Sequence, residues 1–146
     1  MRRLLYKNYL SMIEALPNNE LFRHIYVKNE NGEEIDVTNN GKLSCAIVVS
    51  SVLCLIGWID RPHATVNSTL NKLLENAWTE TNSPIKGDII LYGEDKTGNK
   101  HLGFYIDNAT AISNSSQKGV PIKHDLTMAD GRAPEKYFTR DYSLEV

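Results

Sequence analysis

The stretch GKLSCAIVVSSVLCLIGWID, residues 41–60, is apolar for most of its length and holds both cysteines of the chain. Its β-branched residues suit a strand as well as a helix. However, the apolar part covers residues 45–59, which is longer than a usual strand, and Gly57 is a good residue to end a helix. Ser44 is a good N-cap residue. We therefore predict a helix that begins at Cys45 and is buried on most sides.

The rest of the chain shows helical repeats in the first half and short strand-like runs in the second. Residues 2–16 and 64–78 each repeat apolar side chains at helical spacing. Asn31-Gly32 is a strong tight-turn signal between HIYV and EIDVT, which predicts a small hairpin. Turn residues then separate the strand-like runs, which are DIILYG, HLGFYID, ATAIS, GVPIKHDL and a candidate last strand in EKYFTRDYSLEV.

This order of elements is typical of an α+β fold, in which helices and an antiparallel sheet are segregated along the chain. We expect the helices of the N-terminal half to pack on an antiparallel sheet of about five strands. The length of 146 residues fits a single domain, residues 1–146. Within it, an N-terminal helix and hairpin, residues 1–40, precede a core of residues 41–146.

Composition and charge argue against several classes of protein. The net charge is -2, and no cluster of Lys and Arg interleaves with aromatic residues, so we expect no nucleic-acid partner. The apolar run is too short for a membrane span, which needs about 20 residues. The N-terminus lacks the features of a signal peptide, so we expect a cytoplasmic protein, unless a non-classical route exports it. No metal-ligand spacing or nucleotide-binding motif is present, and we expect no cofactor.

The two cysteines occupy different positions on the predicted helix. Nine residues along one helix separate them by roughly 13 Å, which is too far for a disulfide bond. Cys45 lies at the helix N-terminus, where the dipole and the free N–H groups favour a thiolate and can receive an oxyanion. Cys54 lies in the apolar helix interior and gains none of this. Cys45 is therefore the candidate nucleophile.

A cysteine nucleophile normally needs a base, and His101 is the best placed of the four histidines. It opens the run HLGFYID directly after the loop GEDKTGNK, so it can face a cleft while the strand holds it. Gly103 lies on the same face of the strand and leaves room beside the imidazole. The alternative for His101 is an exposed histidine at a strand end.

At these residues the chain resembles the NlpC/P60 domain, a papain-like cysteine peptidase. In that family a Pro-Gly-Asp turn opens one strand, and a histidine starts the next in a pattern close to H-[VIL]-G-[IF]-Y-[IL]-G-N. Lys86-Gly87-Asp88 matches the turn, HLGFYIDN matches the histidine strand, and SCA at 44–46 matches the nucleophile at the start of a long helix. The resemblance covers about residues 41–124. It implies a papain-like fold, with Cys45 as nucleophile and His101 as base.

The third catalytic position departs from the family pattern. There the family often has a His twelve residues after the base, whereas this chain has Ser113, with Asn114 beside it. The third group accepts the imidazole N–H and holds the ring in one tautomer. Spacing favours Ser113, while chemistry favours Asn114, which a one-residue bulge would turn inward. Both alternatives stay open. Ser44 also replaces the more usual acid or amide before the nucleophile, at the helix start where the backbone would hold an oxyanion.

Other residues are weaker candidates. His63 and Trp78 are candidates for substrate binding in the cleft, although a turn and the core, respectively, are the favoured interpretations. His124 and Asp125 are adjacent, so they point to opposite faces of a strand and cannot easily share a site. We expect a surface or supporting role for His124. We expect His24 to belong to the hairpin.

These features predict a cysteine hydrolase, a thiol protease or amidase. The resemblance implies a cell-wall peptide as substrate, such as a D-glutamyl–diaminopimelate bond of peptidoglycan. One alternative is an intracellular or injected amidase or acyltransferase with another substrate. A lipid substrate would call for a wide apolar groove at Cys45, and a muropeptide for a narrow cleft with cationic groups. Another alternative is an inactive binding domain that keeps the fold, because positions 44 and 113 depart from the family.

Overall fold

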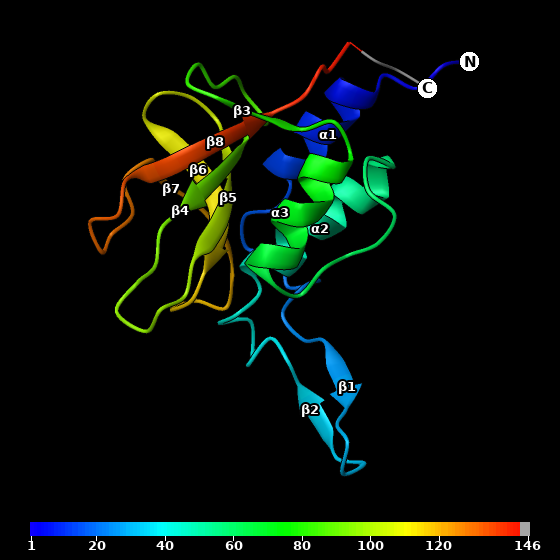
Figure 1. Ribbon diagram of the computed structural model, residues 1–146, viewed down its shortest axis with the longest axis vertical. Helices are drawn as coiled ribbons and strands as arrows, with labels where there is room; N and C mark the ends of the chain where they lie inside the picture. Colours follow the sequence, from blue (N-terminus) through cyan, green and yellow to red (C-terminus); the bar gives the residue numbers. More distant parts are fainter. Residues whose placement is uncertain (144–146) are drawn as a thin grey trace.

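The computed structural model describes residues 1–143, in which helices and a β-sheet form separate layers (Figure 1). The helices are α1 (Leu5–Glu14), α2 (Cys45–Ile56) and α3 (Val66–Glu75). The strands are β1 (Tyr26–Lys28), β2 (Glu34–Asp36), β3 (Thr79–Thr81), β4 (Ile89–Tyr92), β5 (His101–Tyr105), β6 (Thr110–Ser115), β7 (Val120–Asp125) and β8 (Pro134–Thr139). The prediction of an α+β fold with helices mostly in the N-terminal half is confirmed. The last three residues of the predicted final strand, 144–146, lie outside the described residues.

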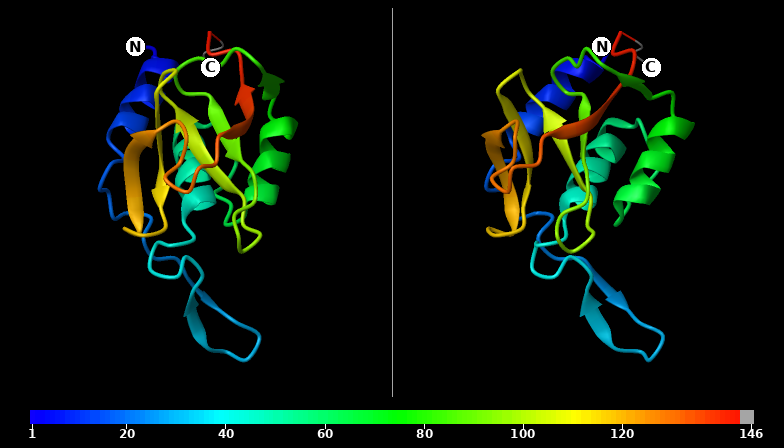
Figure 2. Two further views of the ribbon diagram at one scale, coloured as in Figure 1. Left: turned by 90° about the vertical axis from the view of Figure 1, so that its left-hand side faces the viewer. Right: turned by 60° about the vertical axis from the view of Figure 1, so that its left-hand side comes forward.

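Six strands form one antiparallel sheet in the order β3-β8-β4-β5-β6-β7. About five strands were expected, and the additional one is β3, whose sequence TET is too short and too polar to be recognised as a strand. The three helices lie on one side of this sheet (Figures 1 and 2). α2 contacts β5 and β6 directly, and α1 and α3 both pack against α2. The helix that begins at Cys45 is therefore the centre of the helical layer.

α2 forms and ends where the sequence indicates. Its apolar side chains are buried almost all round, and together with Leu102 and Phe104 of β5 they belong to the main hydrophobic core. Gly57 has a φ of 86°, a left-handed conformation that glycine adopts without strain. Trp58 N–H then donates to the Leu53 carbonyl at 2.9 Å and closes the helix end. These features explain why a long run of β-branched residues is a helix here.

The start of α2 differs from the expected N-cap. Ser44 precedes the helix, but its side chain accepts no hydrogen bond from the helix backbone. Instead, Ser44 Oγ donates to the Phe22 carbonyl at 2.8 Å. The predicted capping role of Ser44 is therefore wrong, because its hydroxyl donates to a carbonyl from a distant segment and does not accept from the helix backbone. The backbone N–H groups of the first helical turn therefore have no cap from Ser44, and they lie at the site described below.

α1 is tied to the turn that opens β4. The hydroxyl of Tyr9, a fully buried residue of α1, donates to the Gly87 carbonyl at 2.6 Å. The next residue, Asp88, is also fully buried, and its carboxylate accepts hydrogen bonds from Thr139 and Tyr142, each at 2.7 Å. This turn thus joins the N-terminal helix, the centre of the sheet and the segment after β8.

β1 and β2 form a separate hairpin that projects from the rest of the molecule (Figures 1 and 2). The turn between them contains Asn31-Gly32, as predicted, and Gly32 has a φ of 80°. Val27 and Ile35 are cross-strand partners with exposed side chains. The hairpin adds no side chain to the main hydrophobic core.

No helix in residues 1–143 is long and apolar enough to cross a membrane. The most apolar of the three, α2, has only 12 residues, and a span needs about 20.

Candidate active site

A cleft of about 1020 Å³ opens beside the first turn of α2. Its walls come from the segment before α2, the first turn of α3, the β4–β5 loop, strands β5 to β7 and the segment between β7 and β8. The lining includes Cys45, His101, Ser113 and Asn114. Residues that lie far apart in the sequence, and that were selected from it as catalytic candidates, therefore meet in one cleft.

Cys45 is the first residue of α2, and it is partly buried. Burial raises the pKa of its thiol above the ordinary value, whereas hydrogen bonds from the backbone of Leu102 and Ala46 act in the opposite direction. The position at the helix N-terminus alone predicts a lowered pKa for this thiol. Desolvation of the thiolate is the larger effect in the folded chain. The resting side chain is therefore a thiol at neutral pH.

His101 is the first residue of β5 and pairs with Tyr92 of β4. The centres of the two rings are 5.8 Å apart. Burial lowers the pKa of His101 to about 3, and the positive charge of Arg132 acts in the same direction. His101 is therefore neutral at physiological pH, and one of its ring nitrogens has a free lone pair that can accept a proton.

Cys45 and His101 both line the cleft beside the first residues of β5. Leu102 and Phe104 face α2 in the main core. Because side chains alternate along a strand, the His101 ring points to the other face. The backbone of Leu102 reaches the Cys45 thiol, but within residues 1–143 no hydrogen bond joins that thiol to the imidazole. Such bonds are often loose in sites without substrate and tighten when substrate binds.

The structure distinguishes the two candidates for the third position. Ser113 Oγ lies 2.9 Å from His101 Nε2. Asn114 points to the other face of β6, where its Nδ2 donates to the Gly41 carbonyl at 2.6 Å. The pairing of Gly103 with Ser113 is regular, and no bulge turns Asn114 toward the imidazole. Ser113 is therefore the neighbour of His101, and Asn114 instead holds the loop before α2.

His124 also reaches this cluster, whereas the sequence predicted only a surface or supporting role for it. Ser113 Oγ lies 2.6 Å from His124 Nε2, so the serine stands between two histidines. His124 points toward β6, and alternation along the strand places the next residue, Asp125, on the opposite face. The register of β6 and β7, which pairs Ala111 with His124, brings it diagonally opposite Ser113.

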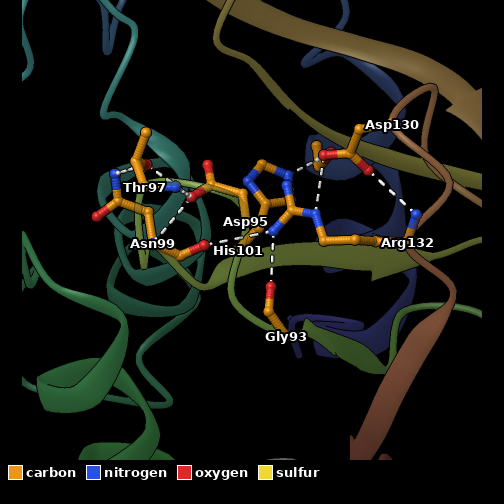
Figure 3. Close-up of polar contacts among 8 residues, drawn as sticks. Gly93, Asp95, Thr97, Asn99, His101, Asp130 and Arg132 are labelled. Atoms are coloured by element: carbon orange, nitrogen blue, oxygen red, sulfur yellow. Dashed lines mark hydrogen bonds and ion pairs between the residues drawn. The ribbon is translucent and has the colours of Figure 1, made fainter.

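Arg132 lies in the part of the cleft wall that the β4–β5 loop and the segment before β8 form (Figure 3). Its Nη1 donates to the Gly93 carbonyl at 2.7 Å, and its Nε donates to Asp130 at 2.9 Å. In the neighbouring β4–β5 loop, Asp95 Oδ1 accepts the backbone N–H of Thr97 at 2.8 Å and of Asn99 at 3.0 Å. Arg132 thus links the segment before β8 to the loop before His101, and it holds a positive charge near the imidazole.

The remaining candidates lie outside the cleft lining. Trp78 is 1% exposed and packs edge-on against Trp58, whose ring lies 4.3 Å from the Arg140 guanidinium. His63 precedes the lining segment of α3, and its backbone N–H donates to Ser50 Oγ at 2.8 Å. Neither residue is placed to bind substrate in this cleft. His24 lies before the hairpin, with its Nδ1 2.8 Å from Asp36 Oδ2.

No group of three or more His, Cys, Asp or Glu side chains in residues 1–143 is arranged to hold a metal ion. The cleft lining includes the thiol of Cys45, the imidazoles of His101 and His124 and the hydroxyl of Ser113, which are groups that suit proton transfer and nucleophilic attack.

Comparison of the chain with protein-family models gave no match, and neither did comparison with the curated proteins.

Proposed function

We propose that the protein is a cysteine hydrolase of NlpC/P60 type that cleaves an amide bond. The observation that carries the proposal is that Cys45, at the start of α2, lines the same cleft as the contacting residues His101 and Ser113. The resemblance of HLGFYIDN and SCA to the histidine and cysteine motifs of that family supports the same roles.

In the proposed mechanism, the resting pair is a neutral thiol and a neutral imidazole. His101 takes the proton of Cys45 as the sulfur attacks the carbonyl carbon of the amide. The backbone N–H groups of the first turn of α2 receive the negative charge on the carbonyl oxygen. The His101 proton then passes to the leaving amine, which gives a thioester on Cys45. Water, deprotonated by His101, hydrolyses this thioester and restores the thiol.

The lining of the cleft favours a peptide over a lipid chain. Most of the lining residues are polar or small, and the large apolar ones are few: Val37, Leu43, Val66, Ile122 and Met128. Lys42 and Lys100 bring cationic groups to the walls, where they suit the carboxylates of a peptide substrate. The same lining holds the acidic residues Glu94, Asp95 and Asp130, and Asp130 pairs with Arg132. A cell-wall peptide, with its free carboxylates, is therefore the substrate class that we propose.

The direct test is incubation of the protein with defined muropeptides, followed by mass spectrometry of the products. Cys45→Ala should reduce cleavage by at least about 1000-fold, as removal of a nucleophile does in other hydrolases. Cys54→Ala is the matched control, because it removes the other thiol from the same helix, and it should retain cleavage. Cleavage that survives in Cys45→Ala and is lost in Cys54→Ala would overturn the assignment.

A non-catalytic binding domain is the second candidate. It is favoured by the raised pKa of Cys45 and by the missing hydrogen bond between its thiol and His101. Such a domain would bind muropeptides, measured by calorimetry, without any product in the mass spectrum. Cys45→Ala would then bind as tightly as the unmodified protein.

A further inference from the structure

We infer that His124 is a positioning residue that fixes the tautomer of His101 through the hydroxyl of Ser113. The inference rests on the proposed function only in the use that it assigns to His101. The hydrogen-bond chain itself belongs to the fold and is present whatever the substrate.

The hydrogen-bond chain begins at a group that can only accept a hydrogen bond. The backbone carbonyl of Asp125 can only accept a hydrogen bond, and His124 Nδ1 lies 2.7 Å from it. In neutral His124 the proton is therefore on Nδ1, and Nε2 carries a lone pair. The opposite tautomer would place the lone pair of Nδ1 against the carbonyl oxygen, which is unfavourable.

The tautomer of His124 then determines which group donates in each of the next two hydrogen bonds. Ser113 Oγ lies 2.6 Å from His124 Nε2, so the serine hydroxyl donates its only proton to that nitrogen. The lone pairs of Ser113 Oγ then face His101 Nε2 at 2.9 Å and accept its N–H. His101 therefore carries its proton on Nε2, which leaves Nδ1 as the basic nitrogen. A serine alone does not set this direction, because its hydroxyl can rotate to donate to either ring.

The surroundings hold the members of this chain in place. Tyr92 is fully buried and packs beside both imidazoles, with ring centres 5.8 Å from His101 and 6.4 Å from His124. Its hydroxyl donates to the Leu126 carbonyl at 2.7 Å, so it does not take part in the hydrogen bonds between Ser113 and the two histidines. Ser113 is 2% exposed, which limits competition from water for its hydroxyl. At the partly buried end of this series, from His124 through Ser113 to His101, neighbouring hydrogen bonds polarise and strengthen one another.

His124 thereby supplies the fixed hydrogen-bond acceptor that the hydroxyl at position 113 cannot be by itself. A carboxylate or an amide oxygen would accept the imidazole N–H without help, but a hydroxyl has one donor and can point it either way. With His124 as a fixed acceptor on the far side, the hydroxyl behaves as an acceptor toward His101. The function of the usual third residue is thus divided between β6 and β7.

The test reads the tautomer directly, by nitrogen NMR of protein labelled with ¹⁵N-histidine at neutral pH. His101 should show a protonated Nε2 and an unprotonated Nδ1. His124→Leu removes the acceptor and should give a mixture of His101 tautomers. His124→Gln is the matched variant, because its side-chain oxygen can accept from Ser113, and it should preserve the Nε2–H form. Thermal unfolding confirms that each variant is folded.

Two results would overturn the inference: a proton on His101 Nδ1 in the unmodified protein, or an unchanged His101 spectrum in folded His124→Leu. Kinetics on a cleaved substrate give the second measurement. His124→Leu should lower kcat by about tenfold with little change in KM, and His124→Gln should recover most of it. If no substrate is cleaved but the tautomers behave as stated, the proposed function fails and the positioning role of His124 stands.

Discussion

Gly103 lies directly opposite Ser113 across β5 and β6, and a Cβ atom on Gly103 would stand 2.9 Å from the Cβ atom of Ser113. The same added atom would lie 3.3 Å from the Ile112 carbonyl oxygen. The glycine thus leaves the space in which the serine hydroxyl meets both histidines. This role follows from close approach and not from backbone conformation.

Gly103→Ala should therefore displace Ser113 and weaken its bonds to His101. We expect a loss of about 1–3 kcal/mol in the free energy of unfolding, as overpacking usually causes, measured by urea denaturation. Turnover should fall as well. In a Ser113→Gly background the main clash is absent, so Gly103→Ala should cost less stability there. Equal losses in both backgrounds would show that the contact with Ser113 is not the cause.

The reactivity of Cys45 should follow its raised pKa. In a Cys54→Ala background, the rate of iodoacetamide alkylation at Cys45 should keep rising with pH beyond about 8.5, where an ordinary cysteine is half ionised. The physical reason is that burial disfavours the thiolate more than the surrounding N–H groups favour it. A midpoint well below that pH would mean that the helix N-terminus dominates instead.

His101 should make the folded state sensitive to acid. Its pKa is about 3 in the folded chain and 6.5 in the unfolded chain, so the unfolded state binds more protons between these values. This contribution to stability is fully present above about pH 6.5 and is lost progressively as the pH falls toward 3. His101→Gln removes the titrating group and should flatten this part of the stability profile. A profile that keeps its slope in the variant would assign the acid sensitivity elsewhere.

Ser113 and Asn114 should differ in their effect on His101. Asn114→Ala leaves the Gly41 carbonyl without its donor and should cost about 1–3 kcal/mol of stability, with the His101 tautomer unchanged. Ser113→Ala should cost a similar amount, because it leaves the imidazole N–H of His101 without its acceptor, and it should also disturb the His101 tautomer. Thermal unfolding and histidine NMR of the two variants make the comparison. A His101 spectrum altered only in Asn114→Ala would reverse the two roles.

The elements that depend on local sequence were predictable. The helix at Cys45 follows from a run too long for a strand and from Gly57, and the hairpin follows from Asn31-Gly32. β3 was not predictable, because three polar residues gain strand structure only by pairing with β8. The capping role of Ser44 failed for a related reason, since the Phe22 carbonyl arrives from a distant segment.

In the site, too, the features that depend on local sequence were predictable, and those that depend on distant segments were not. Cys45 and His101 could be selected from position in an element, and Ser113 from its spacing to His101. The link to His124 depends on how β6 and β7 align, and one residue of slip would turn His124 to the other face. The pKa of Cys45 depends on burial, which the position on a helix does not reveal. Register and burial are properties of the assembled fold.

The neutral state of the Cys45–His101 pair has a consequence for the lifetime of the protein. Peroxides and disulfides attack the thiolate, so a cysteine that remains protonated at rest is slow to oxidise. A nucleophile that was permanently ionised would be exposed to this damage between substrates. In the mechanism proposed above, the sulfur becomes reactive only when His101 takes its proton, and the resting thiol would therefore be shielded from oxidants between substrates.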